Sequence, residues 1–578
     1  MILKALADYY QRLADDPNVD IAPPGFEYKS IDFLVVLDGK GCFEELRDMR
    51  EGTGKKRKGP PRLVPKSVKR ASNVAANLLW DTAAYVFGIN PAKPDRGEKQ
   101  RAAFTERIEQ TFEGNSDAGV GAVLAFLKQG DFMPVFDHSV WPEAEQSGGN
   151  ISFVLTGEAE PICQRPEVVA TIQEKAKPEG RKQTCSLSGR KDVPAELHTA
   201  IKGVWGAQSS GANIVSFNLD AFRSFGKRQG HNASVGQAVE FTYTTALNYL
   251  LASENQRMQV GDASTVFWAK DPCDFESDFH SFLAPKKGEE AVSYEKIKAL
   301  LSAVKTGIPA EESHLPFYVL GLSPNASRIA VRFWYNGNVK EIKERVAKHF
   351  EDIGIIRAPH DPEFLSLFQL LVSTATEQKA DNIQPKLGGE VGRAILAETR
   401  YPRTLLANAM RRCKSEQRVP FARASIIKGV LARNARLAKS GEKEVGMSLD
   451  KEYDNIGYVL GRLFAMLERI QEQAQGQNLN KTIRDTYFGG AASSPQVVFK
   501  RLLDLSVHHL AKIRNSGKSA VWMEKELGAI MALMPQEGAP ATLDLEDQGR
   551  FAVGYYHQRQ DFFTKRETVQ TEEENTNE

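Results

Sequence analysis

The stretch DNIGYVLGRLFAMLERIQEQAQ, residues 454–475, decides the fold class of the C-terminal third of the chain. Its apolar residues recur at the spacing of one helix face, as a core-facing bundle helix requires; they are Ile456, Val459, Leu460, Leu463, Leu467 and Ile470. Helical periodicity with short Gly, Pro and Ser joints extends to both sides of it, over 390–399, 402–414, 421–438, 451–475, 496–514, 518–533 and 545–560. We therefore predict a C-terminal antiparallel helical bundle.

The region before this bundle mixes helix and strand patterns. Helical periodicity predicts helices over 1–15, 66–88, 98–112 and 235–251, and β-rich runs predict strands over 28–39, 151–157, 213–218 and 264–269 and a hairpin over 317–323 and 328–335. Because the two kinds of element do not alternate regularly, we expect an α+β fold, with a mixed α/β N-terminal region followed by the bundle. The predicted domains are 1–380, a basic helical segment 390–445, a bundle 447–566 and an acidic disordered tail 567–578.

The composition excludes several classes of protein. The 578 residues are 41% hydrophobic and 26% charged, as in an ordinary globular protein. The longest apolar run, VGAVLAFL at 120–127, is far shorter than the ~18 residues of a membrane span, and the N-terminus lacks the features of a signal peptide. Five dispersed cysteines without a CxxC pair argue against disulfides and structural zinc. We expect a cytoplasmic protein without a membrane partner.

Positive charge is concentrated in two segments, although the formal net charge is only +1. Residues 47–70 contain ten basic and two acidic residues, and residues 386–439 contain thirteen basic and three acidic residues. Two such blocks favour a polyanionic partner, most simply nucleic acid, over the alternative of a solvated surface patch. The first block includes a Gly- and Pro-bounded loop, EGTGKKRKGPP at 51–61, followed by the start of the predicted helix 66–88.

The central stretch 203–251 is dense in Gly, Ser, Asn and Gln. Several polar residues precede its predicted helix, namely Arg223, Lys227, Arg228, Gln229, His231 and Asn232. Small and amide side chains allow close approach to phosphates or base edges. A buried turn network between a strand and a helix is an equally good interpretation.

No motif indicates catalysis. SGKSA at 516–520 resembles part of a P-loop, but Lys512 stands where the first glycine belongs. Ser209 in AQSSG is not placed between a strand and a helix as a nucleophile elbow requires. His508 and His509 are adjacent and cannot form the i, i+4 pair of a zinc site. We therefore expect no enzyme activity, no metal and no cofactor.

A resemblance to a known family rests on an ordered set of segments. They are SGANIVSFNLDAF (210–222), GKRQGHNASVGQAV (226–239), YTTALNYLL (243–251), GDASTVFWA (261–269), FYVLGLSPNASRIAVRFW (317–334), YPRTLLANAMRRC (401–413), DNIGYVLGRLFAMLERIQEQA (454–474) and GRFAVGYYHQRQDFF (549–563). Together they closely resemble the Csd1 family, the large subunits of type I-C CRISPR Cascade surveillance complexes. The resemblance runs essentially from end to end of the chain.

The resemblance implies a role in RNA-guided antiviral defence. Large subunits of this kind hold the crRNA 5′ handle, recognise the protospacer-adjacent motif in duplex DNA, promote unwinding and R-loop formation, and stabilise the displaced strand. The implied partners are crRNA, target duplex and displaced strand, the Cascade backbone and crRNA-handle-binding subunits, small subunits made from the same gene, and a nuclease–helicase recruited afterwards. In this family the C-terminal portion resembles the small subunit, and Met447 or Val445 is the expected internal start.

Charge alone assigns the expected DNA contacts. The first block is expected at the motif-proximal duplex, through Lys55, Lys56, Arg57, Lys58, Arg62, Lys66, Lys69 and Arg70. The helical arginines are expected to follow the displaced strand, through Arg400, Arg403, Arg411, Arg412, Arg423 and Arg433. The central polar residues join this DNA-binding set as Arg223, Lys227, Arg228, Gln229 and Asn232. Two alternatives remain: a nucleic-acid-processing enzyme whose Asp and His residues converge only in the fold, and a scaffold subunit without DNA contact.

Overall fold

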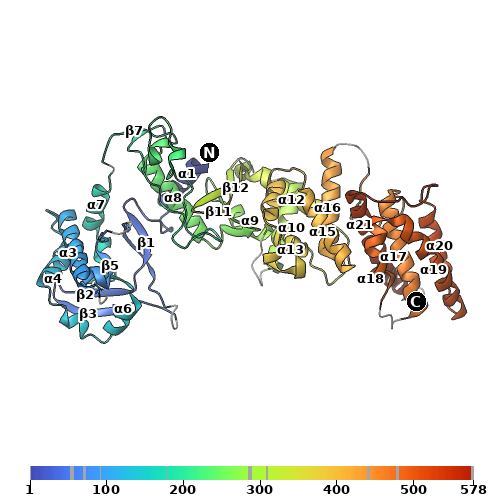
Figure 1. Ribbon diagram of the computed structural model, residues 1–578, viewed down its shortest axis with the longest axis horizontal. Coiled ribbons are helices and arrows are strands. Elements are labelled where there is room, and N and C mark those ends of the chain that lie inside the picture. Colours follow the sequence, from blue (N-terminus) through green and yellow to red (C-terminus); the bar gives the residue numbers. More distant parts are fainter. Residues whose placement is uncertain are drawn as a thin grey trace. The chain divides into compact units, whose positions relative to one another are not determined.

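A computed structural model describes residues 2–52, 57–68, 70, 73–90, 93–177, 179–283, 290–307, 310–438, 443–476 and 481–574 (Figure 1). About 52% of the chain is helical and 14% is strand, which confirms the predicted α+β class. The chain forms two compact units, each assembled from separate segments. We call Leu6–Thr199 with Ser216–Ala246 the N-terminal unit, and Met1–Ala5, Ala200–Val215 and Leu247–Glu578 the bundle unit.

The N-terminal unit is built around a mixed four-stranded sheet in the order β3-β2-β6-β5. Its strands are β2 (Phe33–Leu37), β3 (Phe43–Asp48), β5 (Trp80–Thr82) and β6 (Asn150–Leu155). β2 pairs antiparallel with β3 and parallel with β6, with Phe33 opposite Ile151. All five residues of β2 are buried, as expected for a strand covered on both faces.

Short helices and small sheets complete this unit. The helices are α1 (Ile2–Asp15, whose first residues belong to the bundle unit), α2 (Ala83–Val86), α3 (Pro94–Thr111), α4 (Ala118–Gln129), α5 (Met133–Phe136), α6 (Trp141–Ser147), α7 (Pro166–Lys175) and α8 (Gln237–Ala252, which continues into the bundle unit). Two-stranded sheets join β1 (Phe26–Ser30) with β4 (Pro61–Pro65), and β7 (Gln183–Thr184) with β8 (Lys191–Asp192). α4 packs on β2 and β6, and Asp117 caps its N-terminus through the amides of Gly119 and Val120.

The bundle unit begins with an antiparallel four-stranded sheet in the order β12-β11-β10-β9. Its strands are β9 (Arg257–Val260), β10 (Ala263–Ala269), β11 (Pro316–Asn325) and β12 (Arg328–Asn338), and its flanking helices are α9 (Asp274–Leu283), α10 (Glu290–Thr306), α11 (Ala310–Ser313) and α12 (Val339–Ile353). Phe267 and Phe317 pack against Phe275 and Phe279 of α9 on one face of this sheet. The predicted strand 264–269 and the predicted hairpin are confirmed.

The rest of the bundle unit is helical. The helices are α13 (Leu367–Ser373), α14 (Leu387–Leu396), α15 (Arg403–Glu416), α16 (Phe421–Ala438), α17 (Ile456–Gln475), α18 (Ile483–Ser493), α19 (Pro495–Asn515), α20 (Val521–Met531) and α21 (Leu545–Glu574). α17 contacts α18, α19, α20 and α21 (Figure 1). α17 and α18 run antiparallel, because Gln471 of α17 meets Ile483 at the start of α18 and the earlier Phe464 meets the later Phe488. α20 and α21 also run antiparallel, because Trp522 meets Phe562 and the later Glu526 meets the earlier Gln558. The predicted antiparallel bundle is confirmed.

One hydrophobic core runs through the bundle unit, from Met258 of β9 to Tyr556 of α21. The sheet and the helices beyond residue 380 therefore share a core, and the observed division of the chain falls near residues 199 and 246 rather than 380. α21 also runs to Glu574, into the segment 567–578 that we predicted as a disordered tail.

Two predicted elements are wrong, and a third is divided. The described residues between 66 and 79 contain no helix; β5 and the short α2 follow them instead. Leu79 has a φ of +59°, which breaks a helix, and the buried carboxylate of Asp81 accepts the amide of Asn77. Segment 213–218 makes one isolated bridge, between Asn213 and Arg328, and the predicted strand 28–39 is divided into β1 and β2.

Candidate nucleic-acid interface

The first basic segment contains a paired stem, formed by Glu51 and Lys58. The amide of Glu51 donates to the carbonyl of Lys58 at 3.0 Å, and the amide of Lys58 donates back at 3.2 Å. The tip of this loop, with the predicted contacts Lys55 and Lys56, lies outside the described residues.

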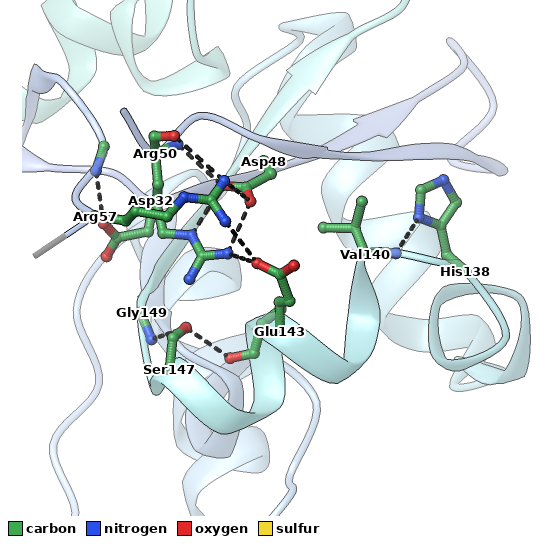
Figure 2. Close-up of polar contacts among 11 residues, drawn as sticks. Asp32, Asp48, Arg50, Arg57, His138, Val140, Glu143, Ser147 and Gly149 are labelled. Carbon is green, nitrogen blue, oxygen red and sulfur yellow. Dashed lines mark hydrogen bonds and ion pairs between the residues drawn. The ribbon is translucent and has the colours of Figure 1, made fainter. Parts of the chain in front are cut away.

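Two arginines at this stem share two carboxylates, an arrangement we call the arginine latch (Asp48, Arg50, Arg57 and Glu143; Figure 2). The Arg50 guanidinium holds Asp48 with Nε–Oδ1 and Nη2–Oδ2 distances of 2.9 and 2.7 Å, and it also contacts Glu143. Arg57 bridges the same pair, 2.8 Å from Asp48 and 2.9 Å from Glu143. The hydrogen bonds from Arg50 lower the pKa of Asp48, so this carboxylate is ionised at neutral pH.

Asp32 fastens the other side of the stem to the sheet. Its carboxylate accepts the amides of Gly59 at 2.8 Å and Asn150 at 2.9 Å. A Cβ at position 59 would lie 1.8 Å from the carbonyl oxygen of Ile31, so only glycine fits there. Because Arg57 takes part in the arginine latch, it is a structural residue of the stem. Lys58, in contrast, is exposed and makes no ion pair with any described residue.

The remaining cations of the first block also have partners within the unit. Arg62 pairs with Glu160 at 2.7 Å, and Lys66 donates to the hydroxyl of Thr199 at 3.1 Å. Arg70 forms an ion pair with Asp81 and lies 3.9 Å from the ring centre of Tyr85. Arg62 and Arg70 keep about a quarter to a third of their side chains exposed.

Lys69 lies outside the described residues. The predicted helix 66–88 does not form in the described residues, so Lys66 and Arg70 do not lie at the start of a helix.

The central loop presents cations from the N-terminal unit. Lys227 and Arg228 are exposed and have no ion pair among the described residues, while Arg223 pairs with Asp220 at 2.8 Å. Asn232 is occupied by its own loop, because its amide donates to the carbonyl of Gln229 at 2.9 Å and its oxygen accepts the amide of Ser224 at 3.1 Å. The turn-network interpretation therefore holds for Asn232, and the cations remain available to a ligand.

Two of the predicted helical arginines are buried in the bundle unit. Arg423 and Arg433 are 0% exposed. Arg423 pairs with Glu416 at 2.6 Å, and Arg433 pairs with Asp352 at 2.7 Å. Side chains without surface cannot reach a phosphate, so we exclude both from the nucleic-acid surface. The sequence shows the charges of Arg423 and Arg433 but not their burial or their carboxylate partners.

The other helical arginines stay near the surface. Arg400 and Arg403 are exposed and have no ion pair with described residues, and Arg411 is exposed with a hydrogen bond of 3.0 Å to Asn408. Arg412 is tied to Glu416 at 3.0 Å.

A basic face on α19 was missed in the sequence. Lys500, Arg501 and Lys512 are exposed and form no ion pair with a described residue. They lie opposite the buried positions Phe499, Leu502, Leu510 and Ile513. The helical periodicity of 496–514 is sufficient to place these three cations on the face that points away from the core.

The partial P-loop and the two adjacent histidines do not form a common site in the described residues. Lys512 lies within α19 and Gly517 follows the helix end, so no phosphate loop forms. His509 Nε2 lies 3.2 Å from the side-chain amide of Gln475, and His508 is exposed. In the described part of the chain, no group of three or more His, Cys, Asp and Glu side chains could hold a metal ion. No described helix is long and apolar enough to cross a bilayer.

Comparison with known proteins identifies a family. A family model described as CRISPR-associated protein (Cas_Csd1) matches residues 6–563, which is nearly the whole chain. No curated protein matches significantly. The match covers both units and all of the cation-bearing segments described above.

Proposed function

Because the chain belongs to the Csd1 family of CRISPR-associated proteins, we propose that it is the large subunit of a type I-C, crRNA-guided Cascade complex. In this role it recognises the protospacer-adjacent motif in duplex DNA, promotes unwinding and R-loop formation, and stabilises the displaced strand. It acts by binding rather than by catalysis, in the cytoplasm. Base pairing by the guide reads the target, and the protein reads the motif and the backbone.

The observation that carries this proposal is the set of exposed cations that have no ion pair among the described residues. In the first basic segment, the central loop, the helical segment and α19, these cations include Lys58, Lys227, Arg228, Arg400, Arg403, Lys500, Arg501 and Lys512. Many other cations of the chain are neutralised by carboxylates, as the arginine latch illustrates. Cations left unpaired on a surface bind phosphates by releasing counterions.

The two units divide this work in the proposal. The loop carrying Lys55 to Lys58, joined by Lys227 and Arg228, contacts the motif-proximal duplex. The face of α19, together with Arg400, Arg403 and Arg411, follows the displaced strand in place of Arg423 and Arg433. An exposed helical face that carries several cations suits a single strand, whose phosphates are contacted without sequence readout.

The proposed partners are those of a Cascade complex: crRNA, the backbone and crRNA-handle-binding subunits, small subunits, and a nuclease–helicase recruited after R-loop formation. A small subunit made from an internal start at Met447 or Val445 would begin shortly before α17. Met447 is 62% exposed and Val445 is buried. Mass analysis of the native complex with an intact gene tests this start, and finding only the full-length chain refutes it.

The main test measures DNA binding by the reconstituted complex with and without this chain. Targets with and without the flanking motif are compared at about 50 and 200 mM salt. Lys500, Arg501 and Lys512 are replaced together by Gln, and Lys379→Gln, at an exposed lysine that is paired with Glu377, is the control. We expect the triple variant to lower the log–log salt slope by about 0.7 per lost contact on a single strand, and the control to leave it unchanged.

Other outcomes identify the alternatives. Equal recognition of the duplex without this chain leaves only a scaffold role. Metal-dependent turnover of DNA by the isolated chain indicates a nucleic-acid-processing enzyme.

A further inference from the structure

A tight turn in the central loop exposes an aromatic side chain. Phe225 is 97% exposed, more than any other large apolar side chain in the described residues. An isolated exposed apolar residue needs no explanation by itself, but this one also has an unusual backbone.

The backbone of the turn disfavours phenylalanine. The amide of Lys227 donates to the carbonyl of Ser224 at 2.9 Å, and the two central residues, Phe225 and Gly226, have φ values of +50° and +69°. Positive φ at both central positions is typical of a type I′ turn, which normally takes Asn, Asp or Gly. A bulky residue at positive φ is rare and strained. Neither burial nor local conformation accounts for Phe225, and strain of this kind is concentrated at functional sites.

The surrounding loop holds the turn in place. The side-chain oxygen of Asn232 accepts the amide of Ser224 at 3.1 Å, and its amide donates to the carbonyls of Gln229 at 2.9 Å and Lys227 at 3.5 Å. The amide of Gly230 donates to the carbonyl of Glu196 at 2.8 Å. The turn is thus braced at both ends by one side chain, so Phe225 is presented on an ordered support.

Cations flank the exposed ring. Lys227 and Arg228 follow it and are exposed without an ion pair among the described residues, and Arg223 precedes it. Asp220 is the single acidic residue of segment 216–232. An exposed aromatic ring beside cations is the arrangement that binds single-stranded nucleic acid, because the ring stacks on a base while the cations contact phosphates.

We propose that Phe225 stacks on an unpaired base of DNA while Lys227 and Arg228 contact the neighbouring phosphates. The inference rests on the proposed function, since it gives the DNA-binding role of the central loop a specific contact. It also separates two kinds of residue in this loop: Asn232 builds the support, and Phe225 meets the ligand.

The test uses the full-length chain and DNA that carries 2-aminopurine at an unpaired position next to a duplex. Stacking on Phe225 is expected to change the fluorescence of this base. Phe225→Ala should weaken binding about 5- to 150-fold, the range for the loss of one base–aromatic stack, and abolish the fluorescence change. Phe225→Trp should retain both, whereas Phe225→Leu should behave like the Ala variant.

Controls separate stacking from folding. Leu219→Ala removes another exposed apolar side chain of the same loop, at 53% exposure, and should leave binding unchanged. Phe225→Gly should raise the melting temperature, because glycine accepts the positive φ without strain, while it weakens binding as the Ala variant does. Lower stability of the Gly variant would make Phe225 a packing residue and overturn the proposal.

The failure of this inference is distinguishable from that of the proposed function. If the wild-type chain binds DNA in a salt-dependent way and Phe225→Ala binds with the same affinity and fluorescence change, the stacking contact is refuted alone. If the wild-type chain and its complex show no salt-dependent affinity for DNA, both proposals fall.

Discussion

His349 and His557 are buried histidines whose protonation is suppressed in the folded protein. Burial lowers the pKa of His349 to about 3, with the charge of Arg433 adding to the effect, and burial lowers the pKa of His557 to about 4. In the unfolded chain both titrate near 6.5. Below that pH the unfolded state binds protons that the folded state excludes, so the free energy of unfolding falls as the pH drops toward 4.

The prediction concerns the pH dependence of stability. We expect each histidine to remove about 2 kcal/mol of stability between about pH 6.5 and 5, which urea unfolding at the two pH values measures. His349→Gln should make this loss of stability smaller. His360 has a side chain that is 85% exposed, so the control His360→Gln should leave the loss unchanged. An unchanged pH dependence in His349→Gln would show that its burial does not control the titration.

Arg433 and Arg403 test whether burial separates structural from DNA-binding arginines. Arg433→Met leaves the buried carboxylate of Asp352 with Arg436 as its remaining cation, at 2.9 Å, so we expect a loss of about 3–5 kcal/mol in the free energy of unfolding. Arg403→Met should change stability by no more than about 0.5 kcal/mol but should reduce the salt dependence of DNA binding. If Arg433→Met instead reduced the salt dependence of DNA binding and left stability unchanged, Arg433 would be a DNA-binding residue.

At the scale of elements, α17 and α21 approach each other through glycines. A Cβ at Gly461 would lie 2.0 Å from the carbonyl oxygen of Phe551, and one at Gly554 would lie 2.3 Å from that of Tyr458. Gly528 in α20 has no neighbouring atom within 4 Å of such a Cβ. Replacement of glycine by alanine should therefore destabilise the protein at Gly461 of α17 and stabilise it at Gly528 of α20.

Gly461→Ala should destabilise the protein by about 1–3 kcal/mol, because the two helices must separate. Gly528→Ala should stabilise it by up to about 1 kcal/mol, because alanine favours the helical conformation. Thermal unfolding of both variants measures the difference. Stabilisation by both would mean that α17 and α21 move apart without cost.

Helical periodicity predicted the long helices well. It failed where side-chain hydrogen bonds to the backbone take the place of the backbone hydrogen bonds of a helix. α16 spans the predicted 421–438, whereas 66–88 has a helical apolar pattern but is shaped by Asp81 and by Leu79 at positive φ. α18 was missed, although Thr482 and Asp485 form a capping box at its start. Charge likewise located basic segments but did not separate Lys58 from Arg57, because ion-pair partners such as Glu143 are distant in sequence.

At the scale of the whole molecule, the continuous core of the bundle unit constrains any shorter product. A chain beginning at Met447 keeps α17 to α21 but loses α15 and α16, on which Gly549 of α21 packs through Leu406, Ile427 and Leu431. It also loses Glu444, the partner of Arg550 at 2.7 Å.

Residues 447–578 produced alone should therefore be helical but unfold at a lower urea concentration than a fragment beginning at residue 387, and should self-associate through the exposed face of α21. Circular dichroism and size-exclusion chromatography measure both properties. Equal midpoints for the two fragments would show that α14 to α16 contribute little to the bundle.

The N-terminal unit is assembled from two segments, and this limits how it can be isolated by truncation or limited proteolysis. His198 Nδ1 lies 2.5 Å from the hydroxyl of Tyr243, and the amide of Thr199 donates to Glu240 at 2.5 Å. A protein ending at Thr199 lacks both partners, because they belong to Ser216–Ala246. To produce this unit alone, residue 199 has to be fused to residue 216 by a short linker. Truncation at a single end point cannot give a protein that contains both segments.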